Sequence, residues 1–332
     1  MGNERLVTVL TDAYNRRVNY LRISITDRCN LRCSYCMPKN GVVALPKKEV
    51  LRYEEIITLC RVAWKLGIEY FRISGGEPLV REGVLDFVKA FKEALPNANL
   101  AMTSNGVLLS NKAEALALAG LDSVNISLDS LKESRFTRIC GFSRLESVIA
   151  GIDAAIASKM RVKLNTLLLA DLIDELQDLL DFGQSRNIPL RFIELMPLDP
   201  QLNERLKEGK LETTHLLQEI KSKETVFACA DTEGAGPARY FELPERGMRI
   251  GLITAMSQPF CHRCNRIRLT SDGKLKPCLS SSFELDVKTC LRSGGEEKEL
   301  SELFRKAIEK KPKAHCLSEG RMPQRVMPSI GG

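Results

Sequence analysis

Three cysteines near the N-terminal end could together hold a metal centre. Cys29, Cys33 and Cys36 lie in the run CNLRCSYC, so three thiols are packed into eight residues. Cysteine thiolates are the usual ligands of iron–sulfur clusters, and a cube of four irons ordinarily takes four of them. Three ligands leave one iron open, as a catalytic zinc site keeps an open position. The spacing therefore predicts a catalytic 4Fe–4S cluster.

A structural zinc site or a disulfide would also use cysteines at this spacing. Structural zinc takes four Cys or His ligands, and the first histidine of the chain is the distant His215. A disulfide between two of the thiols would leave the third one unpaired. The spacing favours the cluster and leaves both alternatives to be tested.

A second set of three cysteines lies in the run CHRCNRIRLTSDGKLKPC. It consists of Cys261, Cys264 and Cys278, and His262 lies inside it. Paired cysteines with a histidine are common zinc ligands, so zinc is the alternative here. His262 directly follows Cys261, which makes joint binding of one ion awkward. We favour a second 4Fe–4S cluster, again with one open iron.

Arg266 and Arg268 follow at once and suggest a phosphate site. Two residues that are two positions apart on a strand project from the same face. Guanidinium groups bind phosphate oxygens in a bidentate manner better than lysine does. A solvated strand face is the alternative, but the neighbouring cysteines favour a bound triphosphate.

Two glycine pairs could lie close to a ligand. Gly75 and Gly76 in SGGEP are placed at the end of a predicted strand, where a missing side chain lets backbone approach a ligand. The chain ends in Gly331 and Gly332, which would ordinarily be a frayed tail. A tip without side chains can also enter a narrow cavity.

Strand-like and helix-like segments alternate over the first part of the chain. The strands are predicted at 21–26, 69–74, 99–105, 121–128, 161–169 and 189–195. The helices are predicted at 53–66, 82–95, 111–119, 144–158 and 172–186. This order is typical of an α/β fold with a parallel sheet and helical crossovers. We expect an incomplete (β/α)6 barrel of the TIM type, with a flat doubly wound sheet as the alternative.

The residues with possible chemistry follow the predicted strands. In a barrel, functional groups gather at the C-terminal ends of the strands. The first cysteine set follows strand one and SGGEP follows strand two. The runs TSNG (103–106), SLDS (127–130) and ELMP (194–197) follow strands three, four and six. The sequence therefore predicts one shared site.

The pattern changes after residue 200, so we divide the chain into 1–200 and 201–332. Residues 201–237 are polar and contain the linker-like run TEGAGPA. Residues 238–255 are β-rich and 298–311 form a charged helix, whereas the Pro- and Gly-rich tail predicts no regular element. The second part would carry the auxiliary cluster.

Composition narrows the class of protein. The chain has 332 residues, 44% of them hydrophobic and 27% charged, as in a globular protein with a sizeable core. The net charge of +7 is spread out and suits a small anionic substrate rather than nucleic acid. Eleven cysteines without a signal peptide or a membrane-length apolar run indicate a reducing compartment, the cytoplasm. An RNA-binding zinc module is disfavoured, since only 6% of residues are aromatic.

The spacing C-x3-C-x2-C with Tyr35 before the last cysteine resembles the signature of the radical S-adenosylmethionine (SAM) enzymes. The resemblance covers almost the whole chain for the branch that cyclises GTP at the first step of molybdenum cofactor biosynthesis. It is carried by LRISITDRCNLRCSYCMP, FRISGGEPLVR, VNISLDSL, VKLNT, RFIELMP, GPARY, CHRCNRIRLTSDGKLKPCL and the final IGG. It implies conversion of GTP to (8S)-3′,8-cyclo-7,8-dihydroguanosine 5′-triphosphate by a SAM-derived radical.

The resemblance also implies roles for individual residues. Both cysteine sets would hold 4Fe–4S clusters, and the open iron of the second would face guanine. SAM would be contacted by Tyr35, Gly76, Ser127 and Met196. GTP would be contacted by Arg22, Arg72, Thr103, Lys163, Arg191, Arg266 and Arg268. Gly331 and Gly332 would support catalysis. Tyr70 is a departure, because relatives often carry lysine there.

The implied partners are GTP, an electron donor such as a flavodoxin or ferredoxin, and the downstream cyclic pyranopterin monophosphate synthase. A homodimer is expected; nucleic acid and membrane are not. The alternative function is a peptide-modifying radical SAM enzyme with an auxiliary cluster, which would prefer a peptide groove. A two-cluster electron carrier is a third possibility, but carriers usually ligate every iron.

Overall fold

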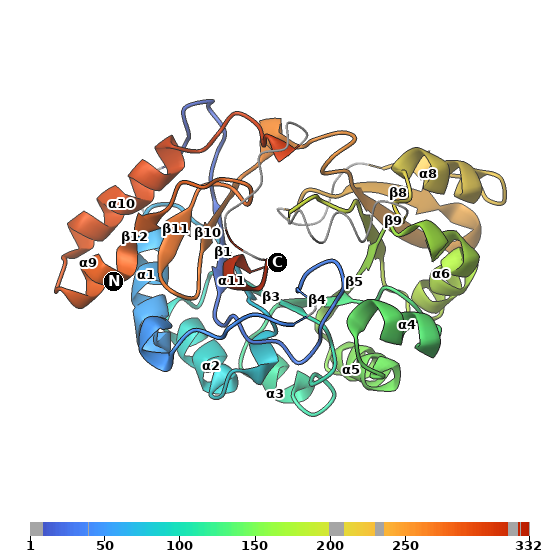
Figure 1. Cartoon of the computed structure of the whole chain (residues 1–332), viewed down its shortest axis with the longest axis horizontal. Coiled ribbons are helices and arrows are strands. Elements are labelled where there is room, and N and C mark those ends of the chain that lie inside the picture. Colours follow the sequence, from blue (N-terminus) through green and yellow to red (C-terminus); the bar gives the residue numbers. More distant parts are fainter. Residues whose placement is uncertain are drawn as a thin grey trace.

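Six parallel strands in chain order form the centre of the protein (Figure 1). The computed structural model describes residues 9–38, 40–198, 209–229, 236–317, 325 and 327–331. The strands are β1 Tyr20–Ser24, β2 Tyr70–Ser74, β3 Asn99–Ser104, β4 Ser123–Ser127, β5 Arg161–Leu167 and β6 Leu190–Ile193. All six lie within or next to the predicted ranges. Because neighbours in sequence are neighbours in the sheet, the order never reverses as it does in a doubly wound sheet. The incomplete barrel is confirmed.

Alternation along each strand separates an apolar outer face from a polar inner face. In β2, Phe71 and Ile73 are fully buried, and the ring of Phe71 meets Phe91 edge to face at 5.3 Å between centroids. Arg72 and Ser74 therefore project from the opposite face. The strands thus place charged side chains inside the arc and hydrophobic ones under the helices.

Helices cover the outer face of the sheet (Figure 1). They are α1 Tyr53–Lys65, α2 Val84–Ala94, α3 Ala113–Leu118, α4 Glu133–Cys140, α5 Leu145–Ala157 and α6 Leu176–Ser185. In α1, for example, Ile56, Leu59 and Ala63 recur at helical spacing and are fully buried. The short helix α4 was not predicted, because its sequence ESRFTRIC is mostly polar.

The C-terminal region extends the sheet at both edges. β9 Met248–Ile253 pairs in parallel with β6, and β10 Arg266–Leu269 pairs in parallel with β1. β8 Arg239–Leu243 and β7 Phe227–Ala228 continue the sheet beyond β9, and β11 Lys274–Lys276 and β12 Leu285–Asp286 continue it beyond β10. Strands from both parts of the chain therefore share one sheet, and the division at residue 200 stays a prediction.

The C-terminal region contains two helices that the sequence analysis did not predict, and one of them contradicts an expectation, that the tail has no regular element. The polar stretch 201–237 contains a helix, α8 Thr213–Lys221, which buries Leu216 and Ile220 on one face. The tail also contains a short helix, α11 Met327–Ile330, stabilised by the fully buried Ile330. In the tail, burial against the rest of the protein outweighed the local composition. α11 and the C-terminal end lie inside the arc (Figure 1).

The charged helix predicted at 298–311 is α10 Glu297–Glu309, and α9 Val287–Arg292 precedes it. α10 lies beside α1, where Lys65 pairs with Glu297 at 2.7 Å between Nζ and Oε2. Within the described part of the chain, we found no helix with the length and apolar character that a bilayer crossing requires.

Candidate active site

A cavity of about 370 Å³ opens at the C-terminal ends of the strands and contacts both cysteine sets. This position agrees with the prediction that the motifs after the strands form one site. Predicted residues that line it are Cys29, Cys33, Cys36, Cys261, Cys264, Cys278, Tyr35, Gly76, Ser127, Met196, Arg22, Arg72, Thr103, Arg191, Arg266 and Arg268.

The first cysteine set lies on a loop after β1 that is held by α4. The amide of Arg32 donates to the carbonyl of Cys140 at 2.9 Å, and the amide of Ser34 donates to that of Ile139 at 2.8 Å. Within the loop, the amide of Cys36 donates to the carbonyl of Cys33 at 3.0 Å. The unpredicted helix α4 therefore positions the predicted ligands.

The surroundings of Cys29 and Cys36 favour neutral thiols when no metal is bound. Burial raises the pKa of the Cys29 thiol to about 11, and the nearby Glu77 adds to that shift. Burial also raises the pKa of Cys36, with Cys33 and Cys29 contributing. Binding of a metal would have to deprotonate these thiols, as metals do.

The SGGEP segment packs directly against the cysteine loop. A Cβ at Gly76 would lie only 2.3 Å from the carbonyl oxygen of Arg28, so only glycine fits there. The next residue, Glu77, is buried, and its carboxylate accepts from the amide of Asn105 at 2.7 Å and from Ser104 Oγ at 3.0 Å. Burial raises the pKa of Glu77 to about 7. Glu77 belongs to the SGGEP run that the sequence analysis singled out, but its contacts with Ser104 and Asn105 were not predicted.

Tyr35 is tied to a second acid that sequence reasoning passed over. Its hydroxyl donates to Asp129 Oδ2 at 2.8 Å, while Asp129 Oδ1 accepts from the amide of Leu167 at 2.8 Å. Burial raises the pKa of Asp129. Asp129 lies in the SLDS run that was expected at the site, so the hydrogen bond connects the cysteine loop to the ends of β4 and β5.

The second cysteine set lies beside β10 and β11. Burial raises the pKa of the Cys261 thiol. Burial would also raise the pKa of Cys264, but the charges of Arg266 and Lys311 outweigh it and lower that pKa to about 6. Lys311 was not predicted. His262, the alternative zinc ligand, is exposed and does not line the cavity.

Neither set is arranged to hold a single metal ion. Among the described residues, no group of three His, Cys, Asp or Glu side chains converges in that way. A four-iron cube poses a different requirement, since each thiolate binds its own iron. Three free thiols on one cavity wall in each set suit that requirement.

Arginines from neighbouring strands lie side by side in the cavity wall. The register pairs Arg268 of β10 with Arg22 of β1, and Arg22 with Arg72 of β2. Burial, followed by the charge of Arg268, lowers the pKa of Arg22 well below its usual value. Burial lowers the pKa of Arg191 and of Arg268 to about 10 in each case.

The arginines of this wall take no part in the ion pairs that form among the described residues. None of the ion pairs that form within the described ranges includes Arg22, Arg72, Arg191, Arg266 or Arg268. Buried charges are ordinarily paired. An anion bound at this wall would supply the negative charge that these arginines lack.

The remaining predicted residues are Lys163, Gly331 and Gly332, and the first two are not among the residues that line the cavity. Lys163 does not line the cavity; its Nζ lies 3.4 Å from the hydroxyl of Tyr240. The carbonyl of Gly331 accepts from Arg268 Nη1 at 2.6 Å, which brings the tail to the arginine wall. Gly332 lies outside the described residues. Tyr70, the departure noted in the sequence, stacks on Tyr20 with ring centroids 6.1 Å apart.

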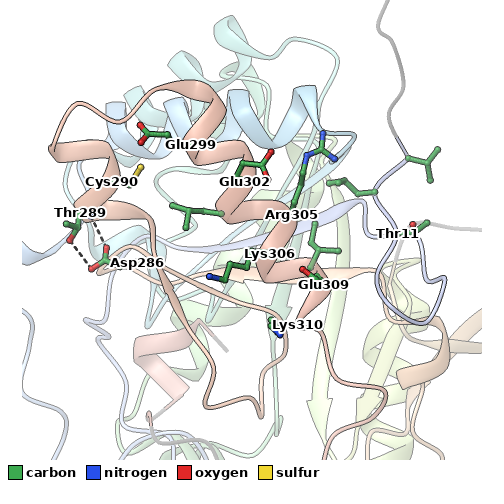
Figure 2. A pocket seen from close by; sticks show the side chains of 14 residues that line it. Thr11, Asp286, Thr289, Cys290, Glu299, Glu302, Arg305, Lys306, Glu309 and Lys310 are labelled. Atoms are coloured by element: carbon green, nitrogen blue, oxygen red, sulfur yellow. Dashed lines mark hydrogen bonds between the residues drawn. The ribbon is translucent and has the colours of Figure 1, made fainter.

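A larger hollow of about 1130 Å³ lies on the outer side, against α9, α10 and the segment at Val9–Thr11 (Figure 2). Charged side chains of both signs line it, among them Glu299, Glu302, Arg305 and Lys310. None of the predicted site residues belongs to it, so its size does not make it the active site.

Comparison with known families defines the class of this chain. The profile of the radical SAM superfamily matches residues 23–183, and that of Molybdenum Cofactor Synthesis C matches 188–317. Streptococcus suis SuiB bound to precursor peptide SuiA has a TM-score of 0.61 at 14% identity, over 96% of this chain and 77% of that one. SuiB bound to S-adenosylmethionine gives 0.59 at 16%, over 88% and 69%. At such identities these structures show the fold alone, that of a radical SAM enzyme.

Curated relatives identify the family within that class. The GTP 3′,8-cyclase of Heliobacterium modesticaldum is 42% identical over 332 residues, which cover 97% of this chain and 100% of the relative. That of Pelotomaculum thermopropionicum is 40% identical over 327 residues, with the same coverage. The chain belongs to the GTP 3′,8-cyclase family of the radical SAM superfamily.

Proposed function

We propose that this protein converts GTP to 3′,8-cyclo-7,8-dihydroguanosine 5′-triphosphate, as a lyase acting at the first step of molybdenum cofactor biosynthesis. The observation that carries the proposal is the shared cavity. It joins two cysteine sets to a wall of arginines that take part in none of the ion pairs of the described residues. A nucleotide triphosphate has both a base and a polyanion, and it would span such a cavity.

The arginine wall would bind the triphosphate. Arg22, Arg72 and Arg268 are neighbours through the strand register, so one chain of phosphates could contact all of them. Bidentate guanidinium–phosphate bonds are strong and directional. Besides burial, repulsion from neighbouring arginines lowers the pKa values of Arg22 and Arg268, and an anion bound there would relieve it. Arg191, Arg266, Thr103 and Lys163 are proposed as further GTP contacts.

The residues around the first cysteine set would orient SAM. Gly76 leaves room for backbone contact, and Ser127 and Met196 lie at or after the ends of β4 and β6 on the same cavity wall. Tyr35 would adjoin them, with its ring fixed by the hydrogen bond to Asp129. Cys29, Cys33 and Cys36 would hold the first cluster.

When bound, this cluster and SAM would supply a carbon radical that takes the hydrogen atom from C3′ of the ribose. A bond from C3′ to C8 of guanine would follow, and one electron from the reductant together with one proton would then complete the 7,8-dihydro product. The protein's contribution is position. GTP would be held at its phosphates by the arginines and at its base near Cys261, Cys264 and Cys278, which would hold the second cluster. Fixing both ends leaves the ribose between the two cysteine sets.

The tail would complete the site. Gly331 is buried and adopts a φ of +74°. A Cβ there would lie 2.6 Å from Ser74 Oγ. Because Gly331 accepts a hydrogen bond from Arg268, we propose that the tail closes the cavity beside the phosphates and excludes water. Gly332 lies outside the described residues, and we propose that it supports catalysis together with Gly331.

We also propose the wider context of the reaction. An electron donor such as a flavodoxin or ferredoxin would supply the reducing electron, and cyclic pyranopterin monophosphate synthase would take the product. The chain would act in the cytoplasm as a homodimer. The cysteine content supports a reducing compartment, and the partner and assembly proposals follow from the family.

The proposal is tested by anaerobic incubation of the reconstituted protein with a reductant, SAM and GTP. We expect 5′-deoxyadenosine and the cyclised nucleotide to form together, with ATP as the matched control that yields neither in quantity. If 5′-deoxyadenosine formation shows no dependence on GTP, the proposed substrate is wrong. A peptide-modifying enzyme would instead respond to a peptide substrate.

A further inference from the structure

Lys311 is a buried lysine whose ammonium group contacts a sulfur and two carbonyls. It follows α10, and only 3% of its surface is exposed. Its Nζ donates to Cys264 Sγ at 3.4 Å, to the carbonyl of Arg266 at 2.7 Å and to that of Pro277 at 3.0 Å. An ammonium group has three donors, so all of them are used.

The sulfur of Cys264 is the acceptor that can carry a negative charge. Burying an ammonium group is costly unless an anion or a full set of hydrogen bonds compensates it. The two carbonyls solvate Lys311 but do not neutralise it. No ion pair formed between residues in the described ranges includes this lysine. A cysteine thiolate at this position supplies the missing charge.

The segment that carries Lys311 is held by Arg16, whose charge is neutralised by an ion pair of its own. Arg16 Nη2 donates to the carbonyl of Pro312 at 2.7 Å, and Nη1 donates to those of Lys313 and Cys261 at 2.9 Å and 2.7 Å. The guanidinium is itself paired with the buried Asp12 at 2.5 Å. Arg16 therefore holds the segment against the cysteine set, while Lys311 brings the uncompensated charge.

We propose that Lys311 compensates the charge of the second cysteine set, and that its hydrogen bond to Cys264 raises the reduction potential of the iron–sulfur cluster bound there. This inference rests on the proposed second cluster. Reduction adds one electron from the reductant and breaks no bond, so a nearby positive charge stabilises the reduced form more than the oxidised form. Net charge and hydrogen bonds to sulfur are known to set such potentials.

Lys311 differs from the arginines of the cavity wall in the use of its hydrogen-bond donors. It also lines the cavity, but its three donors are already taken, so it has none to offer a phosphate. Its sequence neighbour Lys310 is exposed and lies in the outer hollow with Glu309 (Figure 2). Lys310 is thus a matched control that differs in burial and in contact with the cysteines.

The test compares Lys311→Gln, Lys311→Arg and Lys310→Gln in the reconstituted full chain. Iron content is measured first, and the cluster potentials are then followed by electron paramagnetic resonance during a redox titration without GTP. We expect Lys311→Gln to shift one of the two potentials to a more negative value. Lys311→Arg and Lys310→Gln should leave both potentials unchanged. The same titration in a chain with Cys29, Cys33 and Cys36 replaced by alanine assigns the shifted step to the second set.

The outcomes separate this inference from the proposed function. A wild-type chain with about four irons rather than about eight would remove the second cluster itself, since each cube carries four. Full iron content with unshifted potentials in Lys311→Gln would overturn the role of Lys311 alone. Loss of the second cluster in Lys311→Gln but not in Lys311→Arg supports charge compensation, whereas loss in both contradicts it. Weaker GTP binding with an unshifted potential would reassign Lys311 to the phosphates and overturn the proposal.

Discussion

Each cysteine set contains three thiols, but the charged side chains around the two sets are of opposite sign. Around the first, burial and Glu77 raise the pKa of Cys29, and Asp129 lies nearby, hydrogen-bonded to Tyr35. Around the second, Arg266 and Lys311 lower the pKa of Cys264 to about 6 against the effect of burial. Acidic side chains lie near the first set, and cationic side chains lie near the second.

This difference indicates a division of labour along one cavity. A cation-rich wall attracts a polyanion and favours added electrons, whereas the acid-lined end disfavours both. GTP would therefore bind on the side of the cavity that holds the arginine wall and the second set, and the first set would be left for SAM. Cysteine spacing alone could not distinguish the two sites, because it describes the ligands and not what surrounds them.

Removing each cysteine set should have the largest effect and separate the two roles. Alanine at Cys29, Cys33 and Cys36 should reduce SAM cleavage to background, since no radical source remains. Alanine at Cys261, Cys264 and Cys278 should abolish cyclisation while uncoupled SAM cleavage persists. Chromatography of 5′-deoxyadenosine and the nucleotide product measures both, with Cys290→Ala in the outer hollow as the control. Equal loss of SAM cleavage in both triple variants would contradict the division.

Arg268→Met should weaken GTP binding strongly. A hydrogen bond to a charged group contributes about 1.5–3 kcal/mol, which corresponds to roughly a 10- to 150-fold rise in the dissociation constant. Calorimetric titration with GTP measures the change, and Arg61→Met on the exposed side of α1 is the control. Uncoupled SAM cleavage should be kept. An unchanged dissociation constant would remove Arg268 from the phosphate site.

The iron-free protein should show the contrast as a difference in thiol reactivity at pH 7. With a pKa of about 6, Cys264 is mostly thiolate at that pH, whereas Cys29 with a pKa of about 11 is almost entirely thiol. Alkylation by iodoacetamide should therefore be at least about ten-fold faster at Cys264, even though low-pKa thiolates are weaker nucleophiles. The rate at Cys264 should level off above pH 7 while that at Cys29 keeps rising. Peptide mass spectrometry after short iodoacetamide pulses measures the alkylation rate at each cysteine. Equal rates at Cys264 and Cys29 would contradict the described difference between the surroundings of the two thiols.

Gly331→Ala should have the smallest of these effects. The left-handed backbone at φ +74° costs alanine about 1–2 kcal/mol, and its Cβ would meet Ser74. We expect a fall in cyclisation of about 5- to 30-fold through weaker seating of the tail, with GTP-independent SAM cleavage unaffected. Ser329→Ala, within α11, is a control with normal backbone geometry. Wild-type activity in Gly331→Ala would show that the tail contact with Arg268 is dispensable.

The sequence was most informative where chemistry depends on neighbours along the chain. Cys29, Cys33 and Cys36 are close in sequence and were predicted together. Arg266 and Arg268 were expected to share one face of a strand, and they lie on β10. The adjacency of Arg22 to Arg268 depends on the parallel pairing of β1 with β10, which no local pattern contains. Lys311 was missed for the same reason. Within a run of lysines it resembles a solvated helix end, and its contact with Cys264 bridges 47 positions.

The pairing of β10 with β1 and of β9 with β6 has a consequence for how the chain can be divided and made. The first 200 residues would expose both β1 and β6 as bare sheet edges until the C-terminal region is synthesised. Unpaired edges readily join other chains and aggregate. A truncated chain that ends near residue 200 should therefore be insoluble even with all six barrel strands present. By this argument the C-terminal region would keep the first part of the chain soluble, in addition to its proposed contribution to the GTP-binding wall.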